Sequence, residues 1–215
     1  MFVGHYGVSF AGKRLAPSVS LATLFIAVQL LDVGWSLLVL LGIEKVRIVP
    51  GITATNPLDL YYMPYTHSLI AALGWSAAAF LLYRNLAPGA TGRSSLVVAA
   101  AVFSHWVLDF LVHRPDLPLF ANSAKVGLGL WNYRALAFGL EIAVLFGGLA
   151  LYFGSGVTRR GAMIGFGIVM LALQAYIFFG PPPSSDRAAA ITALGAYILF
   201  AAVIGVLERR ATRVA

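Results

Sequence analysis

The sequence contains no cysteine and few charged residues. Without cysteine the chain forms neither disulfides nor thiolate metal sites, so any metal site must use histidine nitrogen and carboxylate oxygen. Charged residues make up 11% of the 215 residues and hydrophobic residues 60%, with a mean hydropathy of +0.87. This composition argues against an ordinary soluble domain and is typical of an integral membrane protein.

The sequence also lacks the clustered basic residues of a nucleic-acid-binding face. Its net charge is +7, but the basic residues stand singly or in pairs at the ends of apolar runs. That distribution follows the positive-inside rule of membrane proteins, so we expect no nucleic-acid partner. The N-terminal residues show no basic segment followed by a short apolar run and a small-residue cleavage site, so we expect no cleaved signal peptide.

The apolar runs predict an all-α, polytopic bundle in one integral membrane domain, residues 1–215. Residues 1–15 are too short and glycine-rich to span a bilayer, and are predicted to be interfacial or re-entrant. Sizeable loops are expected at 43–64 and 114–129, on the same side of the membrane. We expect residues 1–150 to carry the site and 151–215 to serve packing and anchoring. The six predicted transmembrane helices are 18–42, 65–83, 94–113, 130–153, 160–179 and 187–208.

Six spans place both termini on one side of the membrane. Basic residues are more frequent on that side, which predicts that both termini are cytoplasmic. The two long loops then lie outside, where they can cover the mouth of a site. The basic residues expected inside are Lys13, Arg14, Arg84, Arg93, Arg159, Arg160, Arg209, Arg210 and Arg213.

The stretch Ser104–Asp116 carries three ionisable residues inside an apolar run. His105, Asp109 and His113 are spaced four and four, which places them on one face of a helix. Ionisable groups at membrane depth are costly, so such a row indicates a functional site, although each residue alone is also explained by a local hydrogen bond. The other histidines and membrane-depth acids of the chain are His5, His67, Asp32 and Glu141.

Imidazole and carboxylate are ligands for a hard or borderline divalent metal. Helical rise limits how His105, Asp109 and His113 share it. Positions i and i+4 are about 6 Å apart along the axis and can reach one ion, whereas i and i+8 are about 12 Å apart. The row is therefore either a two-ligand pair with a spare, or a ladder in which Asp109 bridges two ions. His5 can join only if residues 1–15 fold back into the membrane.

Several short motifs resemble one bacterial family. They are Gly4-His5-Tyr6-Gly7, Leu31-Asp32, Tyr65-Thr66-His67-Ser68, Ser104-His105-Trp106-Val107-Leu108-Asp109, His113-Arg114-Pro115-Asp116-Leu117-Pro118 and Gly127-Leu128-Gly129-Leu130-Trp131-Asn132. Over about residues 1–150 the chain resembles the membrane-bound, metal-dependent hydrolases of the YdjM-like group, inner-membrane proteins thought to be distantly related to zinc-dependent phospholipase C. The resemblance implies that His5, Asp32, His67, His105 and Asp109 are metal ligands or their neighbours. Members often carry an Asp-x-Asp run where this chain has Asp32-Val33-Gly34.

The leading hypothesis is a metal-dependent hydrolase of the bacterial plasma membrane. It would use one or two divalent ions, most simply zinc, and act on a lipid or lipid-linked (phospho)ester that enters from the bilayer. The predicted metal ligands are His67, His105, Asp109, His113 and His5. Asp32 and Glu141 are the candidate catalytic or supporting acids, and Arg114, Arg134 and Asn132 the candidate substrate contacts at the outer mouth.

Two alternatives stay open at the level of sequence. A small permease or ion transporter would use the same buried His, Asp and Glu residues as a proton or ion path. A structural or assembly partner would need no chemistry, and Gly161-x-x-x-Gly165 offers a close-packing face that a homodimer would use.

Overall fold

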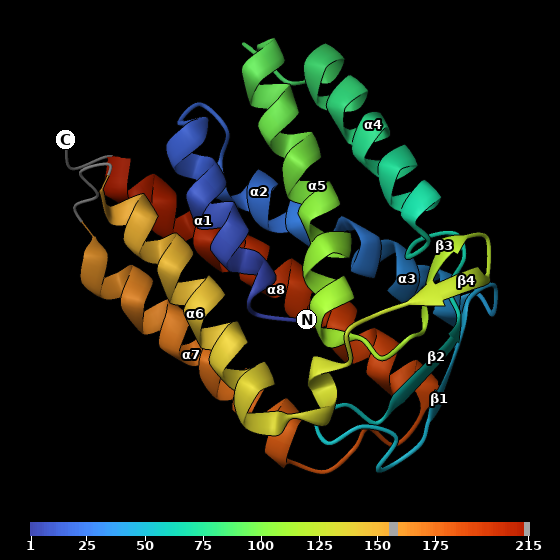
Figure 1. Cartoon of the computed structure of the whole chain (residues 1–215). Helices are drawn as coiled ribbons and strands as arrows, with labels where there is room; N and C mark the ends of the chain where they lie inside the picture. Colours follow the sequence, from blue (N-terminus) through green and yellow to red (C-terminus); the bar gives the residue numbers. More distant parts are fainter. Residues whose placement is uncertain (155–158, 213–215) are drawn as a thin grey trace.

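The computed structural model describes residues 1–154 and 159–212, which form an all-α bundle with two small β-hairpins (Figure 1). The candidate inside residue Arg213 lies outside the described part. The elements in chain order are α1 His5–Leu15, α2 Leu21–Val28, α3 Leu30–Leu40, β1 Lys45–Ile48, β2 Leu58–Tyr62, α4 Leu69–Leu86, α5 Gly92–Val112, β3 Leu117–Phe120, β4 Ser123–Val126, the 3-10 turn Leu130–Asn132, α6 Arg134–Phe153, α7 Arg160–Phe179 and α8 Asp186–Thr212.

The described helices confirm the predicted helical bundle. Five of them, α4 to α8, are long and apolar enough to cross a membrane. The sixth predicted span, 18–42, is wrong as a continuous helix, because it breaks at Gln29 into α2 and α3, whose axes meet at 55°. Gln29 is fully buried, and its side-chain amide donates to the carbonyl of Phe2 at 3.1 Å. The break therefore turns a membrane-length segment into two short helices with freed backbone groups.

The first residues form a helix inside the bundle. Helix α1 packs against α6, α2 and α5, and its Tyr6 and Phe10 are fully buried. A Cβ atom on Gly7 would lie 1.9 Å from the carbonyl oxygen of Val144, and one on Gly148 would lie 1.9 Å from that of Gly7. Only glycine allows the backbones of α1 and α6 to approach so closely. Residues 1–15 were predicted to be either interfacial or re-entrant. Helix α1 lies inside the bundle, which agrees with the re-entrant arrangement.

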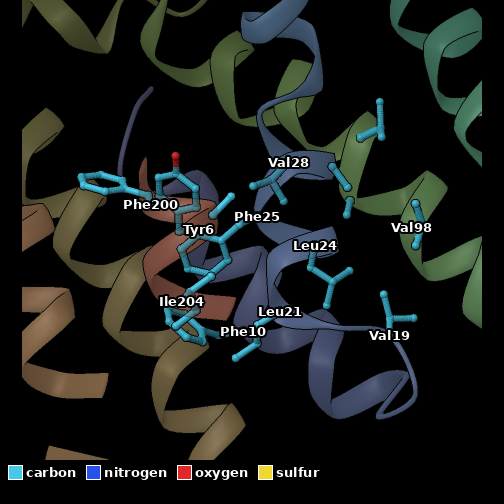
Figure 2. Packing of buried hydrophobic residues seen from close by; sticks show 14 of the residues in the cluster. Tyr6, Phe10, Val19, Leu21, Leu24, Phe25, Val28, Val98, Phe200 and Ile204 are labelled. Atoms are coloured by element: carbon cyan, nitrogen blue, oxygen red, sulfur yellow. The ribbon is translucent and has the colours of Figure 1, made fainter. Parts of the chain in front are cut away.

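The main hydrophobic core holds α1 against α2 and α8. Tyr6 stacks on Phe25 with ring centroids 4.5 Å apart, and Phe200 and Ile204 of α8 close the cluster (Figure 2). These side chains are at most 4% exposed. Burial on this scale fixes the position of α1, and with it the position of His5 at its first turn.

Both predicted loops contain an antiparallel hairpin. In 43–64, β1 pairs with β2, with Ile48 opposite Leu58. In 114–129, β3 pairs with β4, with Leu117 opposite Val126. Figure 1 shows the two hairpins at the same end of the bundle, beside the C-terminal end of α5.

Candidate metal centre

Asp109 of α5 is the point on which all four histidines of the chain converge. Its Oδ1 lies 3.2 Å from Nε2 of His5. Its Oδ2 lies 3.2 Å from Nε2 of His105, 3.4 Å from that of His113 and 3.7 Å from that of His67. Every contact is made through Nε2, and all five residues are buried. Elements separated by up to about a hundred positions thus build one polar cluster inside an apolar bundle.

A second carboxylate enters the cluster from the broken helix. Asp32 of α3 places Oδ1 3.2 Å from Nε2 of His67 and 3.5 Å from Nε2 of His105. Its Oδ2 accepts a hydrogen bond from the hydroxyl of Tyr197 at 2.8 Å. We call the six residues the His/Asp cluster: His5, Asp32, His67, His105, Asp109 and His113.

The cluster contains two groups that can hold a metal ion. Their ligand atoms lie within 4.8 Å of one another, one group being His5, His105 and Asp109, and the other Asp32, His67 and His105. Within residues 1–154 and 159–212, these two are the groups of three or more His, Cys, Asp or Glu residues whose ligand atoms lie this close together. The i,i+4 pair His105–Asp109 belongs to the first group. His113 contacts Asp109 but takes part in neither group.

The tautomer of His105 fits a metal ligand. Its Nδ1 lies 2.7 Å from the carbonyl oxygen of Val28, at the end of α2. A carbonyl only accepts, so Nδ1 carries the hydrogen and a neutral ring directs the Nε2 lone pair at Asp32 and Asp109. Nε2 of His105 is buried and has no hydrogen-bond partner. A lone pair facing carboxylate oxygens is repulsive unless a proton or a cation lies between them, and this donor set suits a divalent cation.

Asp116 and Trp131 contact the ring of His113. Nδ1 of His113 lies 2.8 Å from Oδ1 of Asp116, an arrangement typical of a carboxylate that orients a histidine. Burial alone would lower the pKa of His113, but the carboxylates of Asp109 and Asp116 outweigh it and raise the pKa above its ordinary value. His113 also packs on Trp131, with ring centroids 4.2 Å apart.

Glu141 anchors the segment that leads into α1. Its Oε1 accepts the backbone amide of Phe2 at 3.0 Å, and its Oε2 accepts that of Gly4 at 2.6 Å. The same segment positions His5, whose ring stacks on that of His105 with ring centroids 4.0 Å apart. The α-amino group of Met1 donates to Oδ1 of Asp109 at 2.5 Å. Glu141, predicted as a catalytic or supporting acid, belongs to neither of the two groups that can hold a metal ion, and both of its oxygens accept backbone amides.

The predicted substrate contacts are engaged elsewhere or exposed. Arg114 donates from Nε to Oδ2 of Asp116 at 3.1 Å and pairs through Nη2 with Asp59. Arg134 is exposed and donates to the carbonyl of Ala54 at 3.1 Å. Asn132 is exposed as well. Among the interactions of the described residues, none joins Arg134 or Asn132 to the His/Asp cluster.

Several supporting groups were not predicted from the sequence. They are the carbonyl of Val28, the hydroxyl of Tyr197, and the side chains of Asp116, Glu44 and Thr66. Asp116, three positions after His113, and Thr66, directly before His67, had a local signal. Val28, Tyr197 and Glu44 are distant in sequence from the residues that they support.

Comparison of the chain with family models, curated proteins and solved structures finds no match. The class of protein therefore follows from the fold and the site alone. The chain is a helical bundle with several helices able to span a membrane and a buried His/Asp cluster able to hold a metal ion.

Proposed function

We propose that the protein is a metal-dependent hydrolase of the bacterial plasma membrane, as the resemblance to the YdjM-like group implies. The basic residues favour a cytoplasmic position for the end of the bundle where Lys13 pairs with Glu208, whereas the α-amino group of Met1 lies inside the bundle beside Asp109. The convergence of four Nε2 atoms on two carboxylates is the observation that carries the proposal. With neutral imidazoles, Asp32 and Asp109 carry two negative charges against the one positive charge of the Met1 α-amino group, and the net negative charge favours a bound cation. Nitrogen and oxygen ligands without sulfur, in a site of four histidines, suit zinc.

The residues of the cluster divide into holding and reacting roles. His105 and Asp109 would hold the ion with His5 or His67, and the ion would supply a water-derived nucleophile at neutral pH. The side chain of Asp32 is 16% exposed, whereas the side chains of the other cluster residues are at most 3% exposed. Asp32 is therefore the group best placed to meet a substrate and to accept a proton from water.

The surroundings favour an amphiphilic substrate. The cluster lies among candidate spans with large exposed apolar side chains, such as Leu73, Leu81 and Leu82 of α4. A lipid or lipid-linked ester already present in the bilayer would approach this site without crossing water. Hydrolysis by Zn²⁺-loaded protein of a phospholipid and a carboxylic-ester lipid in mixed micelles tests the proposal. Asp32→Asn is expected to be inactive, and Arg84→Ala, which removes an exposed side chain bound to the carbonyl of Ala90, is expected to stay active. Absence of hydrolysis of both lipid classes by the loaded wild type would contradict it.

A second function, ion transport, is favoured by the helix break. The α2–α3 break lies beside the cluster, and broken helices in transporters often supply the groups that bind ions. A proton between Asp109 and the facing rings relieves the same repulsion as a metal ion, which suits a proton path. Uptake of protons or Zn²⁺ into proteoliposomes that is abolished in Asp32→Asn, without lipid hydrolysis, would favour transport over hydrolysis.

A further inference from the structure

The hydroxyl of Thr66 lies between a buried carboxylate and the ring of His67. Thr66 Oγ1 donates to Oε2 of Glu44 at 2.7 Å and lies 2.8 Å from Nδ1 of His67. Glu44 is 1% exposed, and its Oε1 accepts the backbone amides of Tyr65 and Thr66 at 2.8 and 3.0 Å. The carboxylate that precedes β1 is thus bound to the turn that carries His67.

The direction of these hydrogen bonds fixes the tautomer of His67. A threonine hydroxyl has one hydrogen, and Thr66 gives it to Glu44, so the hydroxyl can only accept from His67. Nδ1 of His67 therefore carries the hydrogen, and Nε2 keeps its lone pair. That Nε2 lies 3.2 Å from Oδ1 of Asp32, within the Asp32, His67 and His105 group.

We propose that Glu44 and Thr66 are positioning residues of the metal centre, which set His67 in the tautomer that presents Nε2 to the ion. The inference rests on the proposed metal centre and adds to it two residues outside the cluster. His105 is oriented by a backbone carbonyl, which substitution cannot remove. His67 is oriented by side chains, so its tautomer can be reversed by a single substitution.

Glu44→Gln separates positioning from a merely structural role. The amide oxygen of Gln still accepts the backbone amides of Tyr65 and Thr66, so the turn is retained. Its NH₂ group would donate to Oγ1 of Thr66, whose hydrogen then turns toward Nδ1 of His67. The ring is forced to carry its hydrogen on Nε2, which can no longer bind a metal ion.

The measurement is Zn²⁺ affinity of the detergent-purified full chain, by competition with a chromophoric chelator. We expect a loss of about 10- to 100-fold for Glu44→Gln and Thr66→Val, the usual cost of removing a group that orients a ligand, and near wild-type affinity for Thr66→Ser. Glu208→Gln is the matched control, because Glu208 accepts the amide of Leu21 at 2.8 Å and pairs with Lys13. Equal affinity in the wild type, Glu44→Gln and Thr66→Val would overturn the inference.

A second readout needs no metal. Long-range ¹H–¹⁵N correlations of metal-free protein are expected to place the hydrogen of His67 on Nδ1 in the wild type and on Nε2 in Glu44→Gln. A wild type that binds no Zn²⁺ would contradict the proposed function, and the tautomer would still decide the hydrogen-bond relay. An unchanged tautomer in Glu44→Gln would overturn the relay itself.

Discussion

Nδ1 of His105 lies 2.7 Å from the carbonyl oxygen of Val28, 77 positions earlier in the chain. The contact exists because α2 ends at Val28, where the chain bends by 55° before α3 begins. The same bend brings Asp32 to within 3.5 Å of Nε2 of His105. One break in one helix thus orients a histidine and supplies the carboxylate that it faces.

Their contacts predict different roles for His105 of α5 and for His113, which directly follows α5. His105 belongs to both metal-sized groups, whereas His113 belongs to neither and contacts Asp109 alone among the acids of the cluster. We expect His105→Gln to abolish Zn²⁺ binding and His113→Gln to weaken it by about 10- to 100-fold, the usual cost of removing a residue that supports a ligand. Chelator competition measures both. Equal losses would make His113 a ligand, as the spacing alone allowed.

The contact between α1 and α6 depends on Gly148. An alanine Cβ there would lie 1.9 Å from the carbonyl oxygen of Gly7, whereas one at the adjacent Gly147 would meet nothing within 4 Å. We expect Gly148→Ala to destabilise the protein by about 1–3 kcal/mol and to displace His5, and Gly147→Ala to be neutral. Thermal unfolding in detergent, followed by Zn²⁺ affinity, compares the two. Equal unfolding temperatures would show that α1 does not pack as described.

Arg114 is expected to stabilise the end of the bundle that carries the two β-hairpins rather than to bind substrate. Its guanidinium contacts the carboxylates of both Asp59 and Asp116, whose side chains are only 8% and 5% exposed. Arg114→Ala would leave these buried acceptors short of a partner, at a cost of about 1–3 kcal/mol. Arg134→Ala is the control, because Arg134 is exposed and binds a single carbonyl. A loss of substrate affinity without loss of stability in Arg114→Ala would restore the predicted substrate role.

The sequence predicted the helical segments best where the apolar run itself decides their limits. Helix α7 occupies 160–179 as predicted, since Gly180 and the prolines that follow end the run. Helix α4 starts four residues later than predicted, because Ser68 caps it through the amide of Ala71 at 3.1 Å. The break at Gln29 has neither proline nor glycine to announce it, and follows from contacts with the N-terminal segment.

The site was predictable in its ligand types and only partly in its geometry. Four-residue spacing on a helix indicated the pair His105 and Asp109 from the rise per residue alone. The inclusion of His5 depends on the close approach of α1 to α6, and Glu141 turned out to hold backbone amides of the same segment. Such long-range packing leaves no periodic trace in a single sequence.

Metal analysis of the purified protein tests the central claim most directly. After incubation with Zn²⁺ and removal of excess ion, the wild type is expected to retain tightly bound metal, and His105→Ala and Asp109→Ala to lose it, while the exposed Arg134→Ala retains it. Full retention of metal in both His105→Ala and Asp109→Ala, or a wild type that retains none, would contradict the account.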